Sequence, residues 1–414
     1  MDRRGVCCRE PGLRSTALDA RELVTELIIW TIDDSTGRGL IRLRIAFDGH
    51  ALTSPAGGVR RYISELGAAL VDLDAGIELV AVGARRADLV PRGIVGVPAP
   101  ALLPTNLGWS VAGLPLAARS AGFDVFHAPA YTAPLWGVRP LVLTIHDVSY
   151  ERHPEWYPHA GGVLRRAFYR RSARVADVII TDSEFSRREI ELAYGIGGDR
   201  VRVIPLGVGP PFLGAAPDAP PPAAGAAPAI LHVGDLHARR NLNVVVRALA
   251  HLRARGGLFP GAFLVLAGRD LGGLASLMAE AGASGVREAI RWIPDADDRQ
   301  VIALYRQARV VVYPSLYEGF GLPALEAMAV GVPVVAARSA AVPEVVGEAG
   351  LLVDPHDAAA WADAIAAIIG SPGRAAALSA AGRARAARFS WRRTAEMTRD
   401  VYADATREGV RARA

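Results

Sequence analysis

The segment Glu318-Gly-Phe-Gly-Leu-Pro-Ala-Leu-Glu326 is the most informative part of this chain about its fold. It follows an apolar run, Val310 to Ser315, and it opens a helical run that ends at Gly331. The strand-like run Val332 to Ala336 comes next. The order of strand, glycine loop, helix and strand is typical of an α/β protein with a parallel sheet.

The two glutamates of this segment lie on either side of a Gly-x-Gly loop. Pro323 suits the first helical turn, so Glu326 is expected about one turn into the helix, with its side chain leaning towards the N-terminus. The free N–H groups there favour an anion such as phosphate, and carboxylates accept hydrogen bonds from sugar hydroxyls. The pattern predicts a sugar-nucleotide site. A glutamate opposing the helix dipole beside an ordinary loop is the alternative explanation.

The longer stretch from Tyr313 to Val335 resembles the glutamate-pair motif of retaining glycosyltransferases of family 4, in their bacterial mannosyltransferase-like branch. The resemblance extends from about Ile41 to about Trp391. It implies an α/β protein of the GT-B fold, with two Rossmann-like, doubly wound parallel-sheet domains and an interdomain cleft. It also implies that Glu318 holds the donor sugar and Glu326 the ribose, while amides of the loop (Gly319, Phe320, Gly321 and Leu322) meet the sugar and diphosphate.

Composition excludes several other classes. With 414 residues the chain is long enough for two domains, and its hydrophobic content of 51% argues against disorder. The apolar patch Leu23 to Ile32 is interrupted by Glu26, so neither a spanning helix nor a signal peptide is expected. The two cysteines, Cys7 and Cys8, are adjacent, which suits a reducing, cytoplasmic setting.

The chain contains no lysine, so all of its basic side chains other than histidine are arginines. This excludes Schiff-base and P-loop chemistry, both of which need a lysine. The net charge of +5 is modest for the length and indicates anionic ligands without indicating nucleic acid.

Alternating strand and helix patterns divide the chain into two similar halves. In the first half the expected strands are 41–48, 77–82, 125–127, 141–145 and 178–181, with a helix from about Val59 to Leu70. In the second half the expected strands are 230–234, 263–267, 290–293, 310–313, 332–336 and 350–353. A helical region from Ala358 to Arg388 and a last helix from Thr394 to about Ala405 follow.

We therefore expect five segments. They are a poorly ordered extension (1–40), an acceptor-binding domain (41–208), a linker rich in proline and alanine (209–228), a nucleotide-sugar-binding domain (229–388) and a C-terminal segment (389–414). By the resemblance, the last segment is a helix that returns to the first domain.

Arg239 and Arg240 lie in Gly234-Asp-Leu-His-Ala-Arg-Arg-Asn241, after a strand and before a helix. The planar guanidinium suits phosphate because it forms two parallel, charge-assisted hydrogen bonds. In the family this loop carries Arg-Lys-Asn, so here an arginine replaces the usual lysine. The resemblance assigns both arginines to the donor diphosphate. It also assigns to the donor the glycines Gly57, Gly58, Gly234 and Gly268, and Ile293 beside the nucleotide base.

Two histidines are candidates for the acceptor side. His146 and Asp147 end a strand, where sites of open α/β sheets lie, and Thr144-Ile-His-Asp147 is similar to a segment of the mannosyltransferase-like branch. His127 is the second candidate. Many members of the family have His-x-His there, but Pro129 replaces the second histidine, so a structural role for His127 stays open.

The acidic run Asp295-Ala-Asp-Asp298 is not taken as a metal site, because aspartate before a helix is a good N-cap. No metal or separate cofactor is expected. The basic segment Arg165 to Arg174 is interpreted either as a solvated helix face or as a contact with an anionic membrane or a lipid-diphosphate acceptor.

The expected function is transfer of a hexosyl group, mannosyl in the first instance, from GDP-mannose or another nucleotide-diphosphate sugar to a glycan or lipid-linked acceptor, with retention. Arg239, Arg240, His146 and Glu318 are the expected catalytic residues. The expected location is the cytoplasm, at the inner face of the membrane. A GT-B epimerase, a phosphorylase-like enzyme and a non-catalytic sugar-nucleotide-binding subunit are the alternatives.

Overall fold

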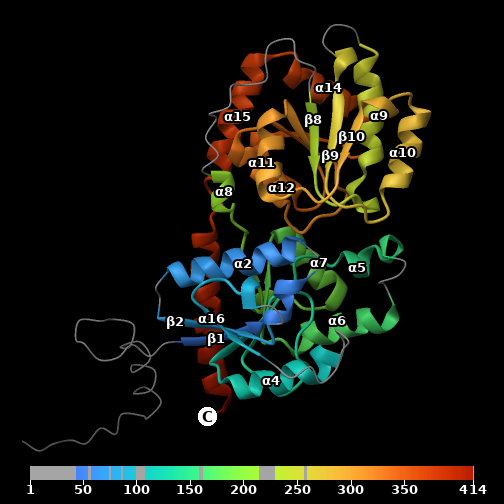
Figure 1. The fold of residues 1–414 in the computed structure, drawn as a ribbon. Helices are drawn as coiled ribbons and strands as arrows, with labels where there is room; N and C mark the ends of the chain where they lie inside the picture. The colour runs from blue at the N-terminus through green and yellow to red at the C-terminus, as the bar shows by residue number, and fades with distance from the viewer. Residues whose placement is uncertain are drawn as a thin grey trace, which may run out of the picture. The chain divides into compact units, whose positions relative to one another are not determined.

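The computed structural model describes residues 43–54, 57–73, 76–84, 87–98, 108–157, 162–213, 229–255 and 259–413. The expected N-terminal extension and most of the expected linker, residues 214–228, lie outside the described residues. The compact unit Arg44–Ala414 contains two sheets, whose strands all pair in parallel (Figure 1). Their strand orders are β3-β2-β1-β4-β5-β6-β7 and β10-β9-β8-β11-β12-β13. Both orders run outward in two directions from the first strand, which confirms the predicted doubly wound fold.

The first sheet consists of seven short strands. They are β1 (Leu43–Asp48), β2 (Ile77–Val82), β3 (Ile94–Val97), β4 (Val125–Ala128), β5 (Leu141–Thr144), β6 (Val178–Thr181) and β7 (Val201–Val203). The main helices of this part are α2 (Gly57–Asp72), α4 (Leu114–Ala121), α5 (Ser149–Arg152), α6 (Val163–Val175) and α7 (Glu184–Tyr194). Every residue of β4, β5 and β6 is buried, as expected for central parallel strands covered on both faces.

The second sheet consists of β8 (Ala229–Val233), β9 (Phe263–Ala267), β10 (Ile290–Ile293), β11 (Val310–Tyr313), β12 (Val334–Ala337) and β13 (Leu351–Val353). Its helices are α9 (Leu242–Arg253), α10 (Leu274–Ala283), α11 (Asp298–Gln307), α12 (Leu322–Val330), α13 (Val342–Val346), α14 (Ala358–Ile369) and α15 (Pro372–Ala386). The short helix α8 (Pro210–Leu213) precedes this half. Figure 1 shows α9 and α10 on one side of β8, β9 and β10, with α11 and α12 on the other.

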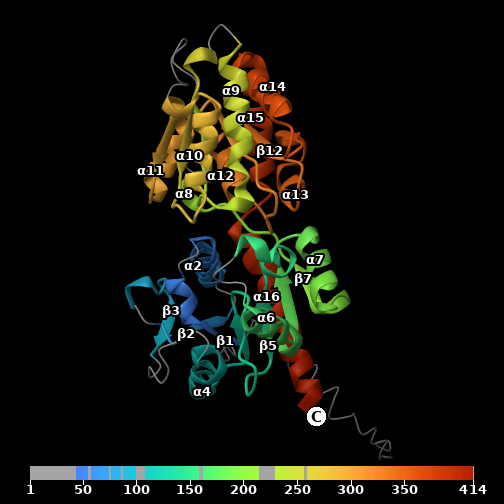
Figure 2. The same ribbon diagram turned by 90° about the vertical axis from the view of Figure 1, so that its right-hand side faces the viewer.

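The last helix, α16 (Trp391–Arg413), packs against α2, β4 and β5 of the first half (Figure 2). Thr394 donates to the carbonyl of Pro205 at 2.7 Å, and Tyr402 forms a hydrogen bond of 2.7 Å with His127. Residues from the end of the chain therefore complete the packing of the sheet nearest its beginning.

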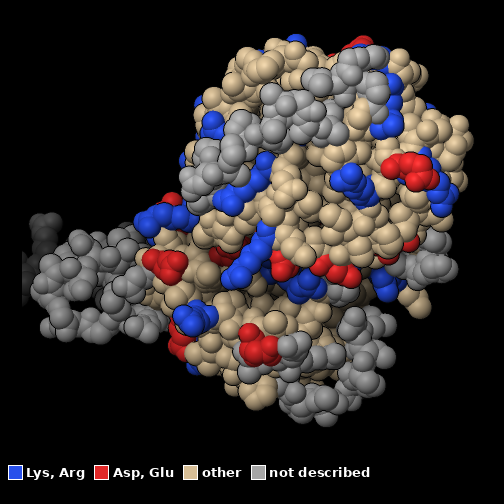
Figure 3. All heavy atoms as spheres, turned by 45° about the horizontal axis from the view of Figure 1, so that its top comes forward, with Lys and Arg blue, Asp and Glu red and all other residues tan. Residues whose placement is uncertain are grey.

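Charged side chains of both signs lie next to each other across the face drawn in Figure 3. Many of them form ion pairs, such as Arg247 with Glu280 and Arg255 with Asp363. On this face the arginines do not form the single-sign patch that binding to a nucleic-acid backbone would favour.

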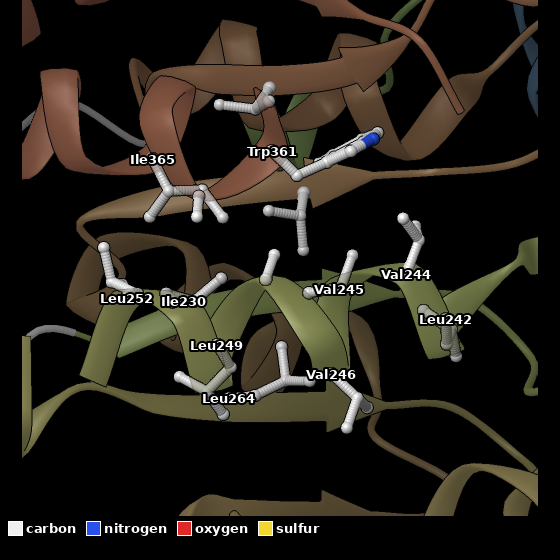
Figure 4. Packing of buried hydrophobic residues seen from close by; sticks show 14 of the residues in the cluster. Ile230, Leu242, Val244, Val245, Val246, Leu249, Leu252, Leu264, Trp361 and Ile365 are labelled. Carbon is white, nitrogen blue, oxygen red and sulfur yellow. The ribbon is translucent and has the colours of Figure 1, made fainter. Parts of the chain in front are cut away.

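The core of the second half forms where α9 lies between α14 and the sheet. Figure 4 shows Trp361 and Ile365 of α14 above Val245 and Leu252 of α9, with Leu264 of β9 on the opposite side. Trp361 is fully buried, and its indole N–H donates to the carbonyl of Asp354 at 2.9 Å. This packing holds α9 and the loop that precedes it firmly against the sheet.

The expected strands at 77–82, 178–181, 263–267, 290–293 and 310–313 are confirmed at the same bounds. Three expectations about elements need correction. Strand β3 was not predicted, because it contains Gly96 and only half-buried or exposed residues, and so lacks an apolar pattern. The helical region 358–388 is two helices, since Ser371 caps α15 and Pro372 begins it. The last helix begins at Trp391 and ends at Arg413, so it is longer than expected.

No single helix of the described residues is both long and apolar enough to cross a membrane. The pair α14 and α15 passes the criteria of length and composition only when taken together, and it is bent by 97°.

Candidate functional site

The loop from β11 to α12 places the two glutamates of the opening motif. Gly321 has a φ of 121°, which only glycine adopts readily, and Pro323 lies in the first turn of α12 as predicted. Gly331 ends the helix in the left-handed conformation. Glu318 and Glu326 are only 7% and 4% exposed, so both carboxylates need partners inside the protein.

The partners of Glu318 are the two predicted arginines. Arg240 forms an ion pair with Glu318 and also donates to Tyr313 at 2.9 Å and to Ser315 at 3.3 Å. Arg239 lies 3.9 Å from Glu318. The sequence-predicted glutamate and arginine pair therefore meet, although 78 residues separate Arg240 from Glu318 in the chain.

The loop that carries the arginines is fixed by its own contacts. Arg239 and Arg240 lie in a 3-10 turn, Ala238–Arg240, that ends at Asn241 with a φ of 52°. Asn241 donates from its side chain to the carbonyl of Pro355 at 2.6 Å. Burial disfavours charge on both arginines, but Glu318 outweighs this effect and raises the pKa of Arg240. The pKa of Arg239 is raised well above its usual range in the same way, with Asp147 contributing.

Two buried polar atoms near Gly234 have no hydrogen-bond partner in the described part of the chain. They are Nε of Arg240 and Nε2 of His232. Burial, followed by the charge of Arg240, lowers the pKa of His232 to about 3, so this ring is neutral. A Cβ atom at Gly234 would lie 3.5 Å from His232 Nε2 and 3.6 Å from Arg240 Cζ. A glycine with a φ of 141° at this position therefore leaves space beside the guanidinium for an oxygen-rich ligand.

Gly268 and Ile293 lie at the same edge of the second sheet as Gly234. Gly268 has a φ of 152°, and a Cβ atom there would overlap the carbonyl oxygen of Gly234. Its N–H donates to the carbonyl of Ile293 at 3.0 Å, and its own carbonyl accepts from the half-exposed Trp292 at 2.9 Å. The carboxyl ends of β8, β9 and β10 thus come together where ligands of such sheets bind.

Glu326 is held by a set of contacts that the sequence did not indicate. Arg61 of α2 forms ion pairs with both Glu326 and Asp298, and its guanidinium lies over the ring of Phe212. The hydroxyl of Tyr305 is 3.4 Å from Glu326. Burial raises the pKa of Glu326 to about 7, although Arg61 acts in the opposite direction. This carboxyl therefore changes its charge near neutral pH.

His146 and Asp147 follow β5 and lie next to the glutamate loop. A Cβ atom at Gly319 would overlap the carbonyl oxygen of His146, so only glycine permits this approach. Asp147 accepts from Arg239 at 3.3 Å and from both the N–H and the hydroxyl of Ser149. The predicted acceptor and donor residues thus lie within one continuous network.

A buried carboxylate, Asp182, accompanies His146. Its Oδ2 atom lies 2.8 Å from His146 Nδ1, and the two residues follow the neighbouring strands β6 and β5. Sequence reasoning missed Asp182 because it treated Val178 to Thr181 only as a strand.

His127 has a packing role in this structure. Nδ1 of His127 forms a hydrogen bond of 2.7 Å with Tyr402, and Nε2 forms one of 2.8 Å with Thr144. Burial lowers its pKa to about 3, so the ring is neutral and both nitrogens are engaged. The structural reading of His127 is therefore the better supported one.

Gly57 and Gly58 begin α2, where a loop had been expected, and both are exposed. A Cβ atom at either would meet nothing within 4 Å, so in this structure their lack of a side chain leaves open space. Arg61, in the same segment, is the functional residue that sequence reasoning missed. The adjacent pair Arg60 and Arg61 was the available indication, but nothing in it distinguished the buried arginine from the exposed one.

Asp297 caps α11 with a reciprocal capping box through Gln300, which confirms the capping interpretation of this acidic run. Among the residues that the structure describes, no group of three or more histidine, cysteine or acidic side chains is placed to hold a metal ion.

In the ligand-free protein the acids and bases of the site neutralise each other. Arg239 and Arg240 pair with Glu318 and Asp147, and Arg61 pairs with Glu326. A ligand with hydroxyl donors for the carboxylates and an anionic group for the guanidinium ions satisfies both sets at once. A sugar attached to a diphosphate has this combination of groups.

Comparison with known proteins agrees with this chemistry. Residues 56–210 match the family model described as Glycosyltransferase Family 4, and residues 219–385 match that described as Glycosyl transferases group 1. The chain is 31% identical to the O-antigen chain mannosyltransferase B of Escherichia coli, over 67% of this chain and 74% of that protein. It is 32% identical to a D-inositol 3-phosphate glycosyltransferase of Xylanimonas cellulosilytica, over 86% and 93%.

Among solved structures, a sucrose-phosphate synthase from Thermosynechococcus elongatus has a similar fold, with a TM-score of 0.70 and 23% identity. The match covers 88% of this chain and 99% of that one.

Proposed function

This chain belongs to glycosyltransferase family 4 and has the GT-B fold, and we propose that it transfers a mannosyl group from a nucleotide-diphosphate sugar to a glycan or lipid-linked acceptor with retention. The observation that carries the proposal is the buried network of Glu318, Arg240, Arg239 and Asp147. A mannosyltransferase among the relatives makes GDP-mannose the first donor to test.

The donor binds by exchanging partners with the protein. Ribose hydroxyls donate to Glu326 in place of Arg61, and sugar hydroxyls donate to Glu318 in place of Arg240. The released guanidinium of Arg240, together with Arg239, then binds the diphosphate by charge-assisted hydrogen bonds. Each internal ion pair that is lost is replaced by a contact with the ligand, so the buried charges are never left unpaired.

Transfer follows a front-face course in this proposal. The bond between the anomeric carbon and the diphosphate oxygen breaks, and the acceptor oxygen forms its bond on the same face of the sugar. The acceptor proton passes to the leaving phosphate. Arg239 and Arg240 stabilise the charge that develops on the departing diphosphate, which is a preorganised electrostatic contribution.

The acceptor enters from the first half, near His146 and Asp147. Helix α6 suits an acceptor at an anionic membrane, because Val163 and Leu164 at its start are 74% and 82% exposed and exposed arginines follow them. Apolar side chains beside arginines favour the boundary of an anionic lipid layer. We infer that the enzyme works in the cytoplasm at this surface and contributes to polysaccharide synthesis.

The experiment that tests the proposal is a panel of nucleotide sugars examined by thermal shift, followed by transfer assays with the best donor. A specific donor raises the apparent melting temperature because it binds only the folded state. Product NMR with a retained anomeric configuration is the expected result.

Three outcomes would contradict the proposal. They are isomerisation of the donor without an acceptor, cleavage of a glycoside by inorganic phosphate, and donor binding with no transfer to any glycan or lipid-linked acceptor. These correspond to an epimerase, a phosphorylase-like enzyme and a non-catalytic binding subunit.

A further inference from the structure

Asp182 and His146 form a buried acid–imidazole pair to which the proposed transfer chemistry gives no role for the acid. The side chain of Asp182 is 3% exposed and that of His146 is 13% exposed. They lie at the carboxyl ends of the neighbouring strands β6 and β5, next to the loop that carries Asp147. Their contact of 2.8 Å joins Oδ2 of the aspartate to Nδ1 of the imidazole.

Asp182 is not needed to hold its own loop. Thr181 donates from its hydroxyl to the carbonyl of Ile145 at 2.7 Å, which ties the two strand ends together. Ser183 caps α7 by accepting from the N–H of Ser186 at 3.0 Å. The residues on both sides of Asp182 therefore make the structural contacts, and the carboxylate itself contacts the histidine.

Each member of the pair keeps one polar atom without a hydrogen bond. Oδ1 of Asp182 and Nε2 of His146 are both buried, and neither has a partner in the described part of the chain. Burying polar atoms without partners costs free energy, so such atoms in a folded protein need an explanation. A site that binds ligand oxygens next to Asp147 and Gly319 supplies one for the imidazole nitrogen.

The groups that face the imidazole come from four elements. Tyr62 of α2 lies edge-on at 4.8 Å between ring centroids, and Tyr131, in the loop after β4, lies at 5.8 Å. Asp147 on the same loop and His127 of β4 interact with it electrostatically. Tyr131 has a φ of 55°, a conformation rare for an aromatic residue.

We propose that Asp182 is a positioning residue, which fixes a proton on Nδ1 of His146 and holds the ring as an imidazolium whose second N–H binds an oxygen of the donor–acceptor complex. The proposal rests on the transferase function for the identity of that complex. It assigns to Asp182 a part in the reaction without contact with either sugar.

The charge state follows from the surroundings of the ring. Burial lowers the pKa of His146, but the Asp182 carboxylate outweighs it, and Asp147 and the carbonyl of Pro129 add to the effect. The net pKa is raised above 6.5. The cation is thus present below the raised pKa and is lost as the pH rises through it. Transfer is expected to decline on the alkaline side for this reason.

The first test needs no substrate. In protein labelled with isotopes at histidine, the His146 resonances are assigned by comparison with His146→Gln and then titrated by NMR. An opposite charge in contact shifts a pKa by about 1–3 units, so Asp182→Asn is expected to lower the pKa of His146 by at least about 1 unit. Asp182→Ser is a second variant with the same expected shift. Equal His146 pKa values in the wild type and in both variants would overturn the proposal.

The matched control is Asp177→Asn. Asp177 lies just before β6, where it accepts from the N–H of Leu141 at 2.8 Å and pairs with Arg139. Its loss is expected to lower the melting temperature and to leave the pKa of His146 unchanged.

The second test is the pH profile of kcat/KM for transfer. In Asp182→Asn the alkaline decline is expected to move to lower pH by the shift that NMR measures, with about tenfold lower activity at pH 7 for each unit and recovery near pH 5.5. An equal loss at every pH would show a merely structural role and would overturn the proposal. If no transfer is found with any acceptor, the proposed function fails, whereas the NMR result still decides whether Asp182 controls the charge of His146.

Discussion

At the scale of single residues, Glu326 couples donor binding to pH. Its pKa of about 7 lies above the ordinary value of 4.5 because burial penalises the charge. Between these two values the folded protein holds a proton that the unfolded chain has lost, so the contribution of this group to stability falls as the pH rises. The ionised carboxylate, which only accepts hydrogen bonds, prevails above about pH 7.

Donor affinity is therefore expected to increase by up to about tenfold between pH 6 and pH 8, as the ionised fraction grows. Glu326→Gln should bind the donor more weakly and should lose this dependence on pH. Titration calorimetry at both pH values measures it. Glu280→Gln, which removes an acid paired with Arg247 away from the site, is the control that should retain the dependence. A flat profile in the wild type would refute this role for Glu326.

Arg240 is the residue on which turnover depends most directly. Arg240→Ala is expected to reduce kcat by about 10²–10³-fold, as loss of a preorganised charge stabiliser does elsewhere. Arg240→Lys keeps the charge but loses the bidentate fork, so its loss should be smaller. Steady-state kinetics of both variants, with Arg247→Ala as a surface control, would test this.

Thermal unfolding must accompany those measurements, because removal of Arg240 leaves Glu318 buried with fewer partners. An Arg240→Ala protein that folds and turns over at the wild-type rate would contradict the assignment.

At the scale of elements, α6 carries the expected contact with lipid. Leu164→Glu places an acid beside Val163 and is expected to reduce co-sedimentation with vesicles of phosphatidylglycerol and phosphatidylcholine. Leu192→Glu, on α7, is the matched control, because Leu192 is also highly exposed at 69%. Equal recovery of the wild type with these vesicles and with pure phosphatidylcholine vesicles would end the membrane proposal.

At the scale of the whole molecule, the protein supplies its own cations to the site. Arg239 and Arg240 come from the loop after β8, and Arg61 comes from α2. These guanidinium ions are placed to neutralise the diphosphate, so transfer is expected to proceed at the same rate in EDTA. The measurement is the initial rate with and without the chelator, after dialysis. An activity that EDTA abolishes and magnesium restores would contradict the arginine-based mechanism.

Much of the fold was accessible from local sequence. Short apolar strands alternating with helices predicted two parallel sheets, and Gly321, Pro323 and Gly331 predicted the start and end of α12. These features depend on the conformations that neighbouring residues allow. The edge strand β3 escaped prediction because it is not buried enough to require an apolar pattern.

The sequence by itself determined the two-sheet architecture, the glutamate loop and the arginine loop, since each is encoded within a few consecutive residues. Only the tertiary structure decided the partners. Arg61 reaches Glu326 across 265 positions, Asp182 reaches His146 from the neighbouring strand, and Tyr402 of α16 engages His127. Charge and hydrogen bonding act over a few ångströms of space, so residues far apart in the chain become partners only after the two sheets and α16 have packed.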